Sequence, residues 1–108
     1  MIITNTNNVD NAQVTEYIGL VFGEVIEGVN FLKDFAAGLR NFVGGRSGTY
    51  EQSLIQARSE AINEMAVRAQ QMGADAILGV KVDYETLGEG GSMLMVTASG
   101  TAVKLQRK

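Results

Sequence analysis

The segment best suited to bind a ligand is the glycine-rich stretch 44–48, which directly precedes the predicted start of a helix. Backbone N–H groups and the dipole at a helix N-terminus favour anions, and Arg46 can donate two parallel hydrogen bonds to a phosphate or carboxylate. We therefore predict a binding site for a small anion, made of Gly44, Gly45, Arg46, Ser47 and Tyr50. The lysine of a P-loop is absent from this stretch. The alternative is a plain helix–helix connection, in which the glycines cap helices and Arg46 pairs with a carboxylate, and glycine-rich turns are more often structural in this way.

Metal-binding candidates are few, because the chain has no Cys and no His, the residues that hold most transition metals. Asp83 and Glu85 share a predicted strand face beside Lys81, and their oxygens could bind a hard cation if a ring of subunits repeats them. The alternative is a polar face or salt bridges between subunits. Four methionines could offer soft thioether ligands or fill gaps in a core; they are Met65, Met72, Met93 and Met95.

The first half of the chain predicts a strand that is apolar on both faces. A possible short strand at 2–4 and a polar loop over 5–13 precede a strand over 16–27. One face of this strand carries Ile18, Leu20, Phe22 and Ile26, and the other carries Tyr17, Val21 and Val25. A strand with one solvated face should instead alternate apolar with polar residues. Gly19 and Gly23 predict a bend or a close backbone approach within it.

Two helices follow in the sequence pattern. Apolar residues at helical spacing after Asn30, a good N-cap, predict a helix that stops at Gly44-Gly45. Thr49-x-x-Gln52 is a capping box and predicts the start of a second helix. Its end is predicted at Gly73, a typical left-handed C-terminal residue. Glu64 and Arg68 lie four residues apart and predict an exposed ion pair.

The last third predicts a hairpin of two strands. From Ala76 the apolar period becomes two, with Leu78, Val80, Val82 and Tyr84 on one face. A flexible loop over 88–92 leads into a strand from Met93 to about Leu105. Its apolar residues change parity after Ala98, and a one-residue bulge near Gly100 would bring both sets to the same face.

The predicted fold is α+β, a single domain over 1–108 with the order β-α-α-β-β and helices on one face of an antiparallel sheet. The apolar residues on the other face then need a second cover, and a neighbouring subunit is the simplest one. The formal net charge of −3 argues against a nucleic-acid partner. No apolar run approaches the about 18 residues of a membrane span, and no signal peptide is visible, so the cytoplasm is the expected location.

Four blocks in the chain resemble the YbjQ family of small bacterial proteins, which carries a heavy-metal-binding label. The blocks are Gly23-Glu24-Val25 with Gly28, Gly44-Gly45-Arg46-Ser47 with Tyr50-Glu51, Gly73-Ala74-Asp75-Ala76-Ile77 with Gly79-Val80 and Asp83, and Gly90-Gly91-Ser92-Met93 through Gly100-Thr101-Ala102-Val103. The resemblance implies a β-α-β-β core like that of dodecin subunits, with extra short strands that promote assembly into a ring-like homopentamer. It supplies no reaction and no cofactor.

Three functions stay open on these grounds. The first is a non-catalytic oligomeric binding protein, with an anion or metal at a subunit interface near Arg46, Tyr50 or the 88–92 loop. The second is a scaffold in which the ring itself presents a surface to partners. The third is an enzyme that uses Arg, Tyr or carboxylate chemistry, for which no base–nucleophile pair or metal triad is visible in the sequence.

Overall fold

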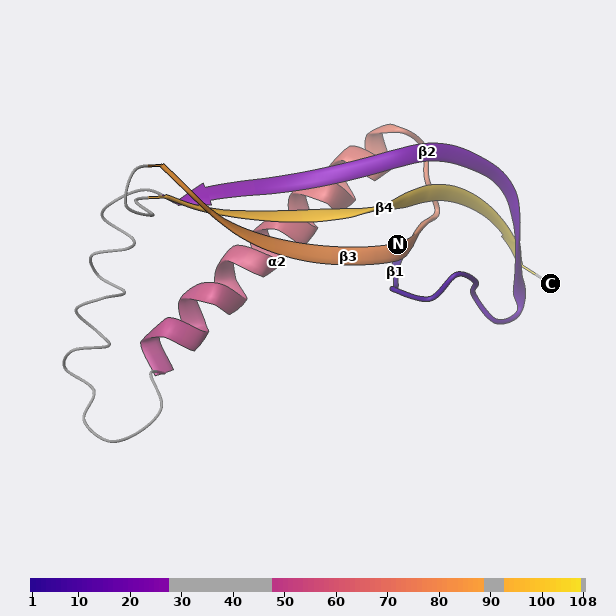
Figure 1. Ribbon diagram of the computed structural model, residues 1–108. Helices are drawn as coiled ribbons and strands as arrows, with labels where there is room; N and C mark the ends of the chain where they lie inside the picture. The colour runs from indigo at the N-terminus through magenta and orange to yellow at the C-terminus, as the bar shows by residue number, and fades with distance from the viewer. Residues whose placement is uncertain (28–47, 89–92, 108) are drawn as a thin grey trace.

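The computed structural model describes residues 1–27, 48–88 and 93–107. It contains the strands β1 (Ile2–Ile3), β2 (Ala12–Glu27), β3 (Ala76–Leu87) and β4 (Met93–Arg107) and the helix α2 (Gly48–Gln71). The strands form one sheet in the order β1-β3-β4-β2. Figure 1 shows β2, β4 and β3 running side by side and curling toward the termini, with α2 crossing one face diagonally. The prediction of an α+β fold is confirmed.

The sheet is mixed rather than antiparallel. β4 pairs antiparallel with both β2 and β3, as predicted, but β1 pairs parallel with the start of β3. The predicted helix after Asn30 lies outside the described residues. Among the helices of the described segments, none is both long and apolar enough to cross a membrane.

The main core lies between the sheet and α2. Alternate β4 residues from Leu94 to Ala102 are buried, so this central strand turns one whole face toward the helix. The helix contributes a stripe at four-residue spacing, each member at most 2% exposed: Ala57, Ala61, Met65 and Ala69. Three alanines in that stripe bring the helix backbone close to the strands.

Helix and sheet backbones approach closely at Gly23 on β2. A Cβ at this position would overlap the Ala61 carbonyl oxygen and would lie 2.6 Å from the Met65 backbone nitrogen. Both atoms belong to helix backbone and cannot move aside as a flexible side chain can. The predicted close backbone approach is therefore confirmed at Gly23.

A second, smaller core lies on the opposite side of the sheet, which we call the far face. Ala76, Leu78 and Val103 are buried there, and they pack against partly buried residues of the N-terminal segment and the strand ends, namely Ile2, Val9, Val14 and Leu105. Val103 and Leu105 thus face away from α2. Their change of parity reflects a second core and not a bulge in β4.

The bulges occur in β2 and β3, so the predicted bulge near Gly100 is wrong. Register shifts lie between Val14 and Glu16 and between Tyr17 and Gly19 on β2. On β3 the shift lies between Leu78 and Lys81. It turns Leu78 to the far face while Val80 and Val82 pack on the helix side, so the prediction of one shared face fails at Leu78. Gly79 has φ +61° at this bulge, a conformation that favours glycine.

Hydrogen bonds at the C-terminus of α2 fit the predicted stop at Gly73. Gly73 has φ +84°; its N–H donates to the Gln70 carbonyl at 3.0 Å, and the Ala74 N–H donates to the Ala69 carbonyl at 3.0 Å. This pair of bonds is the Schellman motif. The helix begins at Gly48, one residue before Thr49, where the capping box predicted its start.

The Gly23 contact gives a stability test. We expect Gly23→Ala to lower the free energy of unfolding by about 3 kcal/mol or more, because the new methyl meets rigid helix backbone. Gly73→Ala is the matched control, since its Cβ position meets only the end of the flexible Lys104 side chain, at 3.8 Å. Only the left-handed backbone opposes that change, at a cost of about 1–2 kcal/mol. Urea denaturation compares the two, and an equal loss would show that space at Gly23 is not limiting.

Candidate functional site

The predicted anion site cannot be placed on this fold. Gly44, Gly45, Arg46 and Ser47 lie outside the described residues. Tyr50 lies in the first turn of α2, where the structure describes only the backbone. The site therefore stays a prediction of the sequence.

The predicted hard-cation site has one member already paired. Asp83 forms an ion pair with Lys81, with 3.5 Å between Asp83 Oδ1 and Lys81 Nζ, and both side chains are mostly exposed. Glu85 follows on the same strand, also exposed. Within the described segments, no three or more Asp and Glu side chains gather as metal ligands would. Because the site was predicted for a ring that repeats Asp83 and Glu85, it stays a prediction.

The methionines do not form one site. Met65 is fully buried in the core under α2, so it fills space in that core. Met95 alternates with the buried residues of β4 and pairs across the strands with Ile26 and Glu85, so it lies on the far face. The sheet thus separates Met65 from Met95.

The most distinctive surface of the chain is a row of large apolar side chains on the far face of β2. We call it the far-face patch; its members and their exposed fractions are Tyr17 71%, Leu20 70%, Phe22 43% and Ile26 56%. Their β4 partners include Ser99 and Thr101, which also face away from the helix. The strand is apolar on both faces, as predicted, but the predicted faces are wrong for two residues: the register shift between Tyr17 and Gly19 puts Tyr17 on the far face and Ile18 on the helix side.

A hollow of about 270 Å³ borders this patch. Asn7, Tyr17, Leu78, Gly79 and Thr101 line it. Leu20 lies in the same row of the sheet, because it pairs with Thr101, which in turn pairs with Leu78. A protruding leucine and a hollow thus lie next to each other on one surface.

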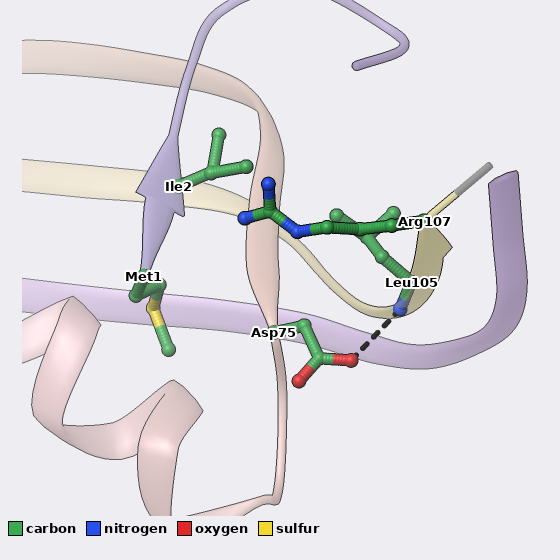
Figure 2. A pocket seen from close by; sticks show the side chains of 5 residues that line it. All are labelled: Met1, Ile2, Asp75, Leu105 and Arg107. Atoms are coloured by element: carbon green, nitrogen blue, oxygen red, sulfur yellow. Dashed lines mark hydrogen bonds between the residues drawn. The ribbon is translucent and has the colours of Figure 1, made fainter. Parts of the chain in front are cut away.

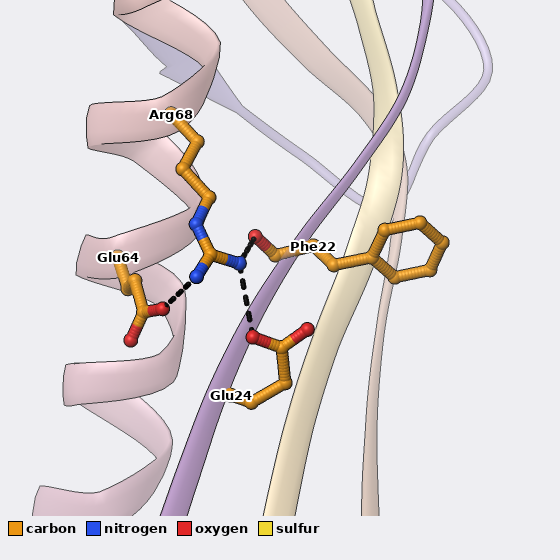
Figure 3. A network of polar contacts seen from close by, with 4 residues as sticks. All are labelled: Phe22, Glu24, Glu64 and Arg68. Atoms are coloured by element: carbon orange, nitrogen blue, oxygen red, sulfur yellow. Dashed lines mark hydrogen bonds and ion pairs between the residues drawn. The ribbon is translucent and has the colours of Figure 1, made fainter.

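At the outer edge of β2, a network around Arg68 fastens the strand to the helix (Figure 3). One guanidinium nitrogen donates to the Phe22 carbonyl at 2.9 Å and to the Glu24 carboxylate at 2.9 Å. The other pairs with Glu64, four residues earlier on α2, which confirms the predicted ion pair. Hydrogen bonding to Glu24 outweighs desolvation, and with the charge of Glu64 it raises the pKa of Arg68.

This network also covers an open edge of the sheet. β2 is an edge strand, and free carbonyls on such a strand invite pairing with another chain. Arg68 donates a hydrogen bond to one of these carbonyls, that of Phe22, and places a positive charge beside it. The contact between Arg68 and Glu24 joins residues 44 positions apart, so no local sequence pattern could have revealed it.

A double-mutant cycle measures the strength of this fastening. We expect Arg68→Met and Glu24→Gln to show a clear favourable coupling in urea denaturation, and we expect high salt to reduce it, because the network lies at the surface. The control cycle, Lys81→Met with Asp83→Asn, should show almost no coupling, since that pair is single and exposed. All proteins should be compared at one concentration. Equal coupling in both cycles would reduce the Arg68 network to an ordinary surface ion pair.

Comparison with known proteins identifies relatives along nearly the whole chain. A family model described as "Putative heavy-metal-binding", that of the YbjQ family, matches residues 1–106. A UPF0145 protein of Acetivibrio thermocellus is 65% identical over 106 residues, covering 98% of this chain and 100% of the relative. UPF0145 proteins of Clostridium kluyveri and Listeria welshimeri are 58% and 59% identical, each over 98% of this chain and over 100% and 96% of their own lengths.

A solved structure shares the fold. It is a protein of unknown function from Pediococcus pentosaceus, assigned to the DUF74 family, with a TM-score of 0.69, 18% identity and coverage of 98% of both chains. At this identity the likeness concerns the fold alone. The family match, by contrast, covers the chain from residue 1 to residue 106. The chain therefore belongs to the YbjQ family.

Proposed function

We propose that this chain is a non-catalytic binding protein that works as a homo-oligomer, with copies meeting through the far-face patch. The observation that carries the proposal is the exposure of four large apolar side chains in one row of a well-paired strand. Large apolar side chains exposed on one face mark contact sites in stable proteins; in this row Glu24 lies between Phe22 and Ile26. The cytoplasmic location predicted from the sequence belongs to the same proposal.

A second copy suits this face better than an unrelated partner, because the surface carries both a protruding side chain and a hollow. Leu20 protrudes, and the cavity lined by Tyr17, Gly79 and Thr101 lies in its own row. One copy can therefore place its leucine against the hollow of the next. A head-to-tail contact closes into a ring where the rotation between copies permits it; the proposal includes that closure, and the family resemblance sets the proposed number of copies at five.

The energetics require that both copies contribute apolar groups. Covering the four exposed side chains of one copy contributes on the order of 5 kcal/mol. Association itself costs about 4–15 kcal/mol in lost freedom and ordering. One patch alone against a polar surface gives little stability, whereas apolar surface from two copies offsets the cost. A ring adds to this, because each copy is held at two contacts.

A substitution in the patch tests the assembly. We expect Leu20→Lys to weaken self-association at least about thirtyfold. The change removes a leucine that the contact between copies would bury, and it places a charge in that contact. Val67→Lys is the matched control; Val67 is 52% exposed but lies on α2, away from the far face. Native mass spectrometry and light scattering should show smaller species for Leu20→Lys and the wild-type assembly for Val67→Lys.

The same measurement decides between the proposed assembly and its alternatives. A wild-type monomer would overturn the proposal. Loss of assembly in the Val67→Lys variant would move the interface to the helix. A wild-type assembly that survives Leu20→Lys would place the contact elsewhere on the sheet.

Ligand loading tests the binding half of the proposal. Native mass spectrometry of the untagged assembly, before and after a panel of divalent metal ions, should show a reproducible added mass. Stoichiometric uptake of one metal would support the family description for this chain. An assembly that carries no added mass and takes up no metal would favour the scaffold function instead.

A further inference from the structure

A second cavity, of about 340 Å³, lies at the sheet end where β1 begins and β4 finishes. Met1, Ile2, Asp75, Leu105 and Arg107 line it. Its volume is at the lower end of the range for small-molecule sites. None of these residues belongs to the far-face patch. Figure 2 shows the Arg107 guanidinium extending toward Ile2, while the Asp75 carboxylate points toward Leu105.

Asp75 is held in place on several sides. Its backbone N–H donates to the Val103 carbonyl at 2.8 Å, and its carbonyl accepts from the Ile2 N–H at 3.4 Å. Its carboxylate Oδ2 accepts from the Leu105 N–H at 2.9 Å. The backbone of Asp75 is thus bonded to β1 and β4, its carboxylate is held through Oδ2 alone, and Oδ1 is left without a hydrogen bond to the described protein. A carboxylate fixed in this way loses little freedom when it binds a cation.

Arg107 supplies the opposite charge on the same cavity. Although Asp75 and Arg107 both line it, they do not pair with each other: the ion pairs of the described chain join Arg68 to Glu24 and Glu64, and Lys81 to Asp83. Two exposed charges of opposite sign therefore line one cavity from separate positions. Between them lie the side chains of Met1, Ile2 and Leu105, which supply the smaller, apolar part of a mainly polar lining.

From this arrangement we propose that the cavity binds a small zwitterion, a free α-amino acid with an apolar side chain. The ammonium group of the ligand donates to Asp75 Oδ1, and its carboxylate accepts a bidentate pair from Arg107. The apolar side chain lies against Ile2, Leu105 and Met1. A ligand with one charge would leave either the carboxylate or the guanidinium unpaired in the occupied site.

The site is complete within one copy of the chain. It therefore goes beyond the proposed assembly and does not depend on it. The Leu20→Lys variant, expected to dissociate, should still bind the amino acid, so failure of one proposal is distinguishable from failure of the other. Because Met1 and Arg107 lie near the two ends of the chain, the protein should carry no tag at either end.

The test is an NMR titration of the ¹⁵N-labelled, untagged protein with L-leucine and L-methionine. We expect saturable shifts of the Asp75 and Leu105 amides, with a dissociation constant of about 1 mM or tighter. Leucinamide lacks the carboxylate and 4-methylpentanoate lacks the ammonium group, and each should bind roughly tenfold or more weakly than leucine.

Two variants assign the charges. Asp75→Asn keeps an oxygen that can accept from the Leu105 N–H but removes the negative charge, so it should weaken leucine binding roughly tenfold and leave 4-methylpentanoate unchanged. Arg107→Gln should weaken leucine and leave leucinamide unchanged. Lys104→Gln, an exposed β4 residue outside the cavity lining, is the control and should bind as wild type. Absence of saturable shifts with both amino acids, or equal shifts with all the compounds, would overturn the proposal.

Discussion

The rest of the structure depends on the packing of α2 against β2 at Gly23. The helix presents mainly alanines to the sheet, and the strand presents no side chain at the point of contact. This close approach buries one face of β2 and leaves the other face to solvent. The Arg68 network then fastens the edge of the same strand to the helix. Because close packing against α2 buries one face of β2, only the residues of its other face stay exposed for contacts.

The sequence predicted those features that follow from local periodicity. The two-sided strand, the end of α2 at Gly73 and the pair of Glu64 with Arg68 could all be derived from spacing alone. Gly23 was expected to mark a close approach, although the sequence could not name Ala61 and Met65 as its neighbours. Spacing along the chain reports which face a residue shares, but it does not report what covers that face.

What the sequence could not predict depends on contacts between distant segments. The parity change at Val103 suggested a bulge, because a single core was assumed; the N-terminal segment instead builds a second core on the far face. Asp75 and Arg107 line one cavity although they are far apart in the sequence. No local sequence pattern around either residue indicates a site. The predicted anion loop at Gly44–Ser47 remains to be tested on the protein itself.

The pairing of β2 with β4 also has a consequence for the order of folding. Ala12 pairs with Arg107, near opposite ends of the chain, whereas β3 and β4 are joined by a short connection. Closing a long loop costs more conformational entropy than closing a short one, and non-local strand pairing slows folding. The β3–β4 hairpin can form from local contacts, whereas β2 can pair with β4 only through contacts between distant parts of the chain. The strand that carries the far-face patch is thus the kinetically costly one to add.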